Sequence, residues 1–359
     1  MMRKTLQIKV GEVTIGGGAP VRVQSMTKTD TEEWKSTLDQ IKELADAGCE
    51  IIRIAVPRKS VLPSFEKIVK NSPIPVIADI HYDWRLAVEA AERGAHGLRI
   101  NPGNIGEAWK VEKIIDAARK AEIPIRIGVN SGSLPAHILK NYGSATSDGM
   151  VEAALEYVKF FESLEFRNIK LSLKASDVKR TVEAYRKISK LVPYPLHVGI
   201  TEAGTLLTGT VKSSVGIGIL LSEGIGDTIR VSLAAPPIYE VKVGWEILKS
   251  LGLRKKGVEL IACPTCGRLE VDLLPIVDEI EKRLEVLEVP MKIAIMGCVV
   301  NGPGEAREAD IGLACGRGVG VIFEKGKIVE RVEETEMVER FLGRVYKLAE
   351  KMKKNERNS

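Results

Sequence analysis

The chain has 359 residues, 44% of them hydrophobic, and a formal net charge of +5 at pH 7. This length exceeds that of one average domain, and the modest positive charge, spread along the chain, favours small anionic ligands over nucleic acid. Because no apolar run reaches the roughly 20 residues that cross a bilayer and no signal-peptide core follows the N-terminus, we expect a cytoplasmic protein that binds neither membrane nor nucleic acid.

The first twenty residues predict a small hairpin, in which 6–10 and 13–15 flank Gly11-Glu12. Short β-branched segments then alternate with amphipathic helical segments. The predicted strands are 21–26, 51–56, 75–80, 97–102, 124–130, 169–175, 195–201 and 228–233. Eight parallel strands with right-handed helical crossovers predict a TIM-type (β/α)8 barrel, because closure leaves no unpaired strand edge. An open doubly wound sheet is the alternative.

The sequence turns polar after the last of these units. We expect a barrel domain over 1–248, a linker over 249–257 and a second domain over 258–359. The second domain is predicted to be α+β. Its expected strands are 258–262, 291–296, 311–315, 319–323 and 327–332, and its expected helices are 270–287 and 336–353.

Four predicted barrel strands carry an arginine between two apolar residues: Arg53, Arg99, Arg126 and Arg230. Because side chains alternate along a strand, these arginines should point into the barrel. A guanidinium keeps its proton, so each needs a carboxylate or a bound anion. Other polar residues on the same face of the barrel are expected at the strand ends where barrel active sites form. They are Asp79, His81, Asn101, Asn130, Lys170, Ser172, Lys174, His197, Glu202 and Ser232.

An internal salt-bridge lattice with Asp79 and Glu202 is the alternative for any single arginine. For the whole set, the basic groups outnumber these two carboxylates, which favours an anionic, oxygen-rich ligand such as a diphosphate. Glu202 follows the seventh strand and is a candidate for acid or base catalysis, or else a partner for Lys174 or Arg230. His81 and His197 either orient a substrate or are satisfied core groups.

Three of the five cysteines lie in two loops of the second domain. Cys263 and Cys266 form a Cys-x-x-Cys pair, and Cys298 precedes a Gly-Pro-Gly turn that ends at Glu305. This spacing favours an iron–sulfur cluster with three thiolates and a weaker oxygen ligand, for which Glu305 is the candidate. A structural zinc site and a redox disulfide are the alternatives. A zinc-stabilised anion-binding barrel without redox activity would carry the same residues.

Both halves together resemble the 4-hydroxy-3-methylbut-2-enyl diphosphate synthases of the non-mevalonate isoprenoid pathway, nearly from end to end. The motifs that carry the resemblance are Val23-Gln24-Ser25-Met26-Thr27, Ala78-Asp79-Ile80-His81, Arg99-Ile100-Asn101-Pro102-Gly103-Asn104, Arg126-Ile127-Gly128-Val129-Asn130, His197-Val198-Gly199-Ile200-Thr201-Glu202 and the two cysteine loops.

The resemblance implies a barrel that binds a cyclic methylerythritol diphosphate, and a C-terminal module, similar to a sulfite-reductase domain, that holds a [4Fe–4S] cluster. It implies cluster ligation by Cys263, Cys266, Cys298 and Glu305, and catalytic roles for Glu202 and Glu305. It assigns substrate contacts to Arg53, Asp79, His81, Arg99, Asn101, Arg126, Asn130, Lys174, Arg230 and Ser232.

The implied reaction is a two-electron reductive ring opening with loss of water, which gives a linear allylic diphosphate. The resemblance implies ferredoxin or flavodoxin as the electron donor. It also implies a homodimer in which the barrel of one subunit meets the cluster module of the other.

Overall fold

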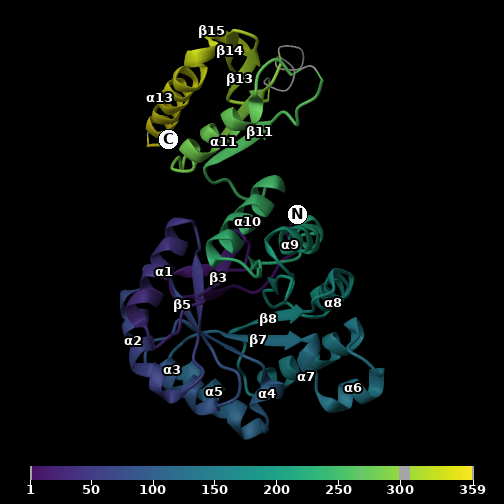
Figure 1. Cartoon of the computed structure of the whole chain (residues 1–359). Coiled ribbons are helices and arrows are strands. Elements are labelled where there is room, and N and C mark those ends of the chain that lie inside the picture. Colours follow the sequence, from purple (N-terminus) through teal and green to yellow (C-terminus); the bar gives the residue numbers. More distant parts are fainter. Residues whose placement is uncertain (1, 268, 299–307, 358–359) are drawn as a thin grey trace. The chain divides into compact units, whose positions relative to one another are not determined.

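The computed structural model describes residues 2–267, 269–298 and 308–357, which divide into two compact units (Figure 1). Unit 1 is Met1–Arg254 and unit 2 is Lys255–Ser359. The helix before this division, α10 (Pro237–Ser250), ends inside the expected linker of 249–257.

Unit 1 contains an eight-stranded parallel sheet that closes on itself. Its strands are β3 (Arg22–Met26), β4 (Ile51–Ala55), β5 (Val76–Asp79), β6 (Gly97–Ile100), β7 (Ile125–Asn130), β8 (Ile169–Lys174), β9 (His197–Val198) and β10 (Thr228–Ile229). Strands β3 to β8 are neighbours in chain order, and β10 lies between β9 and β3. Between β8 and β9 the Leu171 N–H donates to the carbonyl of Pro195 at 3.0 Å, and Leu171 pairs with Leu196. The barrel prediction is confirmed, and the open doubly wound alternative is wrong.

Helices surround the strands of unit 1 (Figure 1). The larger ones are α1 (Trp34–Asp46), α2 (Leu62–Asn71), α3 (Trp84–Glu92), α5 (Ala108–Lys120), α7 (Ser147–Ser163), α8 (Val178–Leu191), α9 (Leu206–Ser222) and α10. Shorter helical turns are η1 (Lys59–Val61), α4 (Pro102–Ile105), η2 (Ser131–Ser133) and α6 (Ala136–Tyr142). Helix α7 is capped at its start, where the Thr146 side chain accepts the Gly149 N–H at 3.0 Å.

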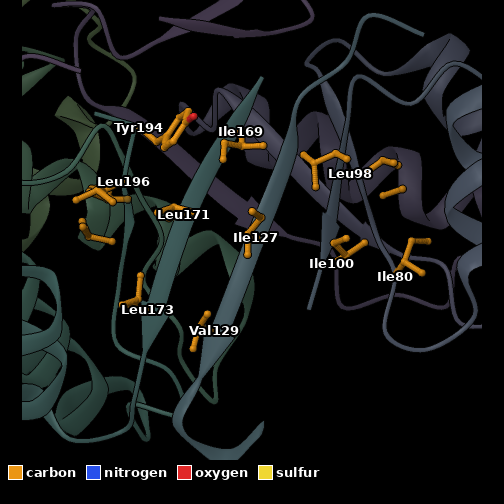
Figure 2. Close-up of a cluster of buried hydrophobic side chains, with 14 of the residues drawn as sticks. Ile80, Leu98, Ile100, Ile127, Val129, Ile169, Leu171, Leu173, Tyr194 and Leu196 are labelled. Atoms are coloured by element: carbon orange, nitrogen blue, oxygen red, sulfur yellow. The ribbon is translucent and has the colours of Figure 1, made fainter. Parts of the chain in front are cut away.

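The barrel wall is apolar on its outer face, where the helices pack. Figure 2 shows part of this layer, including Ile127 and Val129 on β7 and Leu171 and Leu173 on β8. Gly128 lies between Ile127 and Val129, and Ser172 lies between Leu171 and Leu173. Since side chains alternate along a strand, these two positions face the barrel interior.

An N-terminal hairpin closes the amino end of the barrel. Strands β1 (Ile8–Val10) and β2 (Val13–Ile15) are antiparallel, and their apolar side chains pack with Ile51 and Ile77. These two isoleucines stand at the amino ends of β4 and β5. This packing covers the amino end of the barrel, and the carboxyl ends of the strands are where barrel active sites form.

Unit 2 is built on a five-stranded mixed sheet in chain order. Its strands are β11 (Val258–Ala262), β12 (Met291–Met296), β13 (Ile311–Gly316), β14 (Val319–Glu324) and β15 (Lys327–Glu333). The first three are parallel and the last two pair antiparallel. The helical elements are α11 (Leu273–Leu284), η3 (Glu334–Glu336) and α13 (Met337–Arg357). The predicted α+β character is confirmed.

Membrane-spanning helices are absent from the described parts of both units, since no helix there is long and apolar enough to cross a bilayer.

Candidate functional site

Charged side chains line the inside of the barrel. The strand registers set Asp79 beside Arg99, Arg99 beside Arg126, and Arg126 beside Lys170. All four side chains are buried. One carboxylate and three cations thus lie side by side on four neighbouring strands, which is the inward orientation that the alternation of the sequence predicts.

Asp79 is the centre of an ion-pair network. Its carboxylate oxygens lie 3.1 Å from Arg99 Nη1, 3.5 Å from Arg53 Nε and 3.3 Å from His81 Nε2. Burial opposes ionisation of this carboxyl group, but Arg53, His81 and Arg99 outweigh burial and hold the pKa of Asp79 below its usual range. Asp79 therefore stays a carboxylate and orients both arginines.

Arg126 forms no ion pair with any carboxylate of the described residues. Its side chain is 2% exposed, and its Nε and Nη1 have no hydrogen-bond partner among the described residues. Burial, together with the charges of Arg53 and Arg99, lowers the pKa of Arg126 well below its usual value. An isolated buried cation costs several kcal/mol, so this position is arranged for an incoming anion.

Two lysines of β8 add to the excess of positive charge. Lys170 and Lys174 are buried, and Lys170 Nζ has no hydrogen-bond partner in the described part of unit 1. Burial and the nearby Arg126 lower the pKa of both lysines. An anion among these groups would favour their charged forms.

Two glycines make room for the cations. A Cβ on Gly128 would lie 3.0 Å from Arg99 Nε, and one on Gly199 would lie 2.9 Å from Lys174 Nζ and 2.3 Å from the carbonyl oxygen of Arg230. The chain can pass close to the charged groups at these positions because glycine has no side chain.

The carboxylate nearest Arg230 is Glu240, which the sequence reading did not single out. Arg230 Nη2 lies 3.6 Å from Glu240 Oε2, whereas Glu202 forms no ion pair within the described residues. Glu240 lies in the first turn of α10, among buried apolar residues. In the sequence, Glu240 is an acidic residue in the first turn of a helix whose neighbouring residues are apolar. Acidic residues are also common in the first turn of exposed helices, so this feature alone does not identify Glu240.

The remaining predicted substrate residues lie at the same end of the barrel. Asn101 is buried, donates from Nδ2 to Ser133 Oγ at 2.8 Å, and accepts the Gly103 N–H at 3.1 Å. Asn130 ends β7 beside Lys174, and the partly buried Ser232 follows β10. Asn101 is therefore already held by its own loop.

Glu202 stands apart from the ion pairs. It is exposed, and its φ of +50° lies in the left-handed region that non-glycine residues rarely adopt. Such a conformation costs on the order of 1 kcal/mol and is often found at functional sites. The loop after β9 therefore presents an uncompensated carboxylate at the barrel mouth.

His197 is a core residue. Its ring is fully buried, and Nδ1 lies 2.8 Å from Thr228 Oγ1. Burial and the charge of Lys174 lower the pKa of His197 well below its usual value, so the ring is neutral.

Three of the four cysteines of unit 2, Cys263, Cys266 and Cys298, lie at the carboxyl ends of β11 and β12, which are adjacent parallel strands. The Cys263 N–H donates to Ile295 at 2.9 Å, and the Leu269 N–H donates to Cys266 at 3.0 Å. The Glu270 N–H then donates to Gly297 at 3.3 Å, next to Cys298. Backbone contacts thus draw both cysteine loops to one end of the sheet.

The donor chemistry of this corner fits a thiophilic metal centre. Cys263 and Cys298 have free thiols, and Thr265 between Cys263 and Cys266 turns the loop with a φ of +63°. Soft thiolates suit iron–sulfur clusters. Among residues 2–267, 269–298 and 308–357, no group of three or more His, Cys, Asp or Glu side chains forms a metal site as it stands. Glu305, the predicted fourth ligand, lies outside these residues.

Comparisons with known proteins cover both units. The GcpE TIM-barrel domain matches residues 5–245, and the GcpE protein C-terminal domain matches residues 259–347. A relative from Geobacter sulfurreducens is 56% identical over 352 residues, which are 98% of this chain and 100% of that protein. A relative from Clostridium acetobutylicum is 56% identical over 339 residues, which are 94% of this chain and 97% of that protein. Both are named 4-hydroxy-3-methylbut-2-en-1-yl diphosphate synthase (flavodoxin).

Some solved structures align with about two thirds of this chain. The 3-dehydroquinate dehydratase of Geobacillus kaustophilus aligns with a TM-score of 0.50 at 13% identity, over 69% of this chain and 99% of that one. A dihydropteroate synthase of Yersinia pestis aligns with a TM-score of 0.50 at 12% identity, over 69% and 98%. At these identities the likeness concerns the fold only.

Proposed function

This chain belongs to the GcpE family, and on that premise we propose that it converts 2-C-methyl-D-erythritol 2,4-cyclodiphosphate into (E)-4-hydroxy-3-methylbut-2-enyl diphosphate. The reaction opens the ring, takes up two electrons and two protons, and releases one water. The observation that carries the proposal is 56% identity to the Geobacter sulfurreducens synthase over 98% of this chain. A zinc-stabilised anion-binding barrel without redox activity is not favoured, because the relatives are named as synthases.

The diphosphate is held by the cations inside the barrel. Arg53, Arg99, Arg126 and Lys174 surround the position, with Arg230 at its edge. The excess of buried positive charge over Asp79 and Glu240 supports this assignment, since a diphosphate supplies the missing negative charge. Asp79 fixes two of the arginines in place, which reduces the entropy lost when the substrate is bound and oriented.

Polar groups at the strand ends complete the substrate contacts. Asn101, Asn130 and Ser232 supply hydrogen-bond donors beside the cations, and His81 lies next to Asp79. Glu202 is assigned to proton transfer, which its exposed position at the barrel mouth supports.

The enzyme is an iron–sulfur oxidoreductase. We assign a [4Fe–4S] cluster to Cys263, Cys266, Cys298 and Glu305. When bound, the cluster supplies the two electrons in single steps. Flavodoxin is the proposed donor, as the names of the relatives indicate, and ferredoxin is the other candidate.

A homodimer is also part of the proposal, and α9 supports it. Leu207, Val211 and Val215 recur every fourth residue on this helix, and Leu207 is 78% exposed. Such a face favours contact with a second copy, because a two-fold axis brings identical residues together and this stripe contains no charges. We place each active site between the barrel of one subunit and the cluster domain of its partner.

Anaerobic purification tests the proposed function. The expected protein is brown, contains iron and sulfide in similar amounts, and forms the allylic diphosphate from the cyclic diphosphate when reduced flavodoxin is added. A colourless, zinc-containing protein without turnover would contradict the proposal and support the binding-protein alternative.

A further inference from the structure

The barrel is closed by few strand contacts where β10 meets β3. The ladder consists of Thr228 beside Arg22 and Ile229 beside Val23, and it ends before Arg230. The segment that follows, 230–235, carries two of the proposed substrate residues. Its path must therefore be fixed by other contacts.

Glu240 makes four contacts with one carboxylate, and two of them are to this segment. The side chain is 1% exposed. Its Oε1 accepts the Leu233 N–H at 3.1 Å and lies 3.2 Å from Lys28 Nζ. Its Oε2 accepts from Ser25 Oγ at 3.3 Å and lies 3.6 Å from Arg230 Nη2. Glu240 thus joins α10, β3, the loop after β3 and the segment after β10.

Lys28 holds the same segment from the other side. Its Nζ donates to the carbonyl of Leu233 at 2.8 Å and to that of Ala235. The backbone of Leu233 is therefore held on both sides: its N–H donates to Glu240, and its carbonyl accepts from Lys28. These two residues form what we call the seam clamp.

The clamp also orients Arg230. Glu240 binds this guanidinium at Nη2, while Arg230 Nε is buried and has no hydrogen-bond partner among the described residues. Arg53 and Arg126 lie near enough to repel Arg230. Without the negative charge of Glu240, that repulsion would move the guanidinium away from the other cations.

We propose that Glu240 is a positioning residue for substrate binding: through the seam clamp it fixes Arg230 and the path of the segment that carries Ser232. Glu240 acts through these groups and does not touch the substrate. The inference rests on the proposed function and names a residue that the function did not require.

The test compares Glu240→Gln with Glu246→Gln. Glu246 lies in the same helix, is 65% exposed and pairs with Lys249 on the surface, so the control makes the same chemical change outside the clamp. We expect Glu240→Gln to raise KM for the cyclic diphosphate on the order of tenfold, with a much smaller change in kcat, because binding geometry is lost and the chemistry is not. The Glu246→Gln variant should retain the wild-type KM.

An unchanged KM in folded Glu240→Gln would overturn the inference. An equal rise in KM in Glu240→Gln and Glu246→Gln would overturn it as well. If Glu240→Gln does not fold, Lys28→Met provides the same test from the partly exposed side of the clamp. We then expect a raised KM in Lys28→Met and recovery in Lys28→Arg; equal KM values in all three proteins would overturn the inference.

Binding of inorganic pyrophosphate separates this inference from the proposed function. Calorimetry should show pyrophosphate bound on the order of tenfold more weakly by Glu240→Gln than by wild type. If wild type does not turn over the cyclic diphosphate but this difference persists, the proposed function fails and the positioning role stands. If wild type neither turns over the cyclic diphosphate nor binds pyrophosphate, both fail.

Discussion

At the scale of single residues, the chemistry of the barrel depends on which charges are paired. Asp79 compensates Arg53 and Arg99, and Glu240 lies near Arg230. Arg126 has no such partner among the described residues. The two kinds of arginine should therefore respond differently to substitution.

Replacing Arg126 by alanine should weaken substrate binding without the loss of stability typical of a core truncation. We expect KM to rise at least about tenfold, because a charge-assisted contact to the diphosphate is lost. The unfolding temperature without ligand should stay close to that of wild type, because the change also removes the repulsion by Arg53 and Arg99. Steady-state kinetics and thermal unfolding measure both. Arg186→Ala, which breaks a surface pair with Glu223, is the control; an unchanged KM in Arg126→Ala would remove Arg126 from the diphosphate site.

Replacing Asp79 by asparagine should be destabilising at neutral pH. Removing one partner of a buried ion pair costs about 3–5 kcal/mol, because Arg53 and Arg99 lose their compensating charge. The folded-state pKa of Asp79 lies below the ordinary value of about 3.9, so its stabilisation is complete above that value and disappears as the pH falls through the folded pKa.

The unfolding temperatures of wild type and Asp79→Asn should therefore differ most above about pH 5, and the difference should begin to shrink below about pH 4. Asp116→Asn, at an exposed pair with Arg119, should show no such pH dependence. A difference that is constant from pH 3 to pH 7 would mean that ionised Asp79 does not stabilise the barrel.

At the scale of elements, the strand ends are shaped by close approach. The segment after β9 passes Lys174 and the backbone of Arg230 so closely that only glycine fits at residue 199. Residue 343 on α13 is different, because a Cβ there would meet nothing within 4 Å. The same substitution should thus have opposite effects at the two positions.

We expect Gly199→Ala to lower the unfolding temperature and raise KM, because the Arg230 carbonyl is backbone and cannot move aside cheaply. Gly343→Ala should raise stability by about 0.5–1 kcal/mol, since alanine favours a helix over glycine. Denaturant unfolding measures both changes. Wild-type stability in Gly199→Ala would mean that the chain at residue 199 can accommodate a Cβ despite these short distances.

At the scale of the whole molecule, the proposed dimer makes two predictions. A charge at Leu207, the most exposed residue of the α9 face, should separate the subunits, because burying an uncompensated carboxylate is costly. Leu207→Glu is therefore expected to be monomeric by light scattering, whereas Leu191→Glu, at an exposed leucine of α8, should remain dimeric. A dimeric Leu207→Glu protein would place the interface elsewhere.

Mixing two impaired variants, assayed at a substrate concentration well below the KM of Arg126→Ala, tests whether the active site is shared between subunits. Arg126→Ala impairs the barrel and Cys266→Ser impairs the cluster domain. If the site joins two subunits, a mixed dimer contains one intact barrel facing one intact cluster domain, and activity should return after subunit exchange. Persistent inactivity in verified mixed dimers would place each site within one chain.

The sequence by itself determined the architecture of this protein, because strand alternation, helix periodicity and glycine or proline punctuation are local signals. It therefore predicted the eight barrel strands, the α+β second unit and the inward direction of Arg99 and Arg126. The family motifs likewise need only short stretches of sequence.

Only the tertiary structure decided which charges meet. Ser25 and Glu240 are 215 residues apart in the chain, and no local pattern links them. A pairing of Glu202 with Lys174 or Arg230 was one alternative, but Glu202 is exposed in a left-handed turn, and Glu240 lies beside Arg230 instead. Partner choice inside a closed barrel depends on register and side-chain reach across the interior, and these are properties of the folded chain.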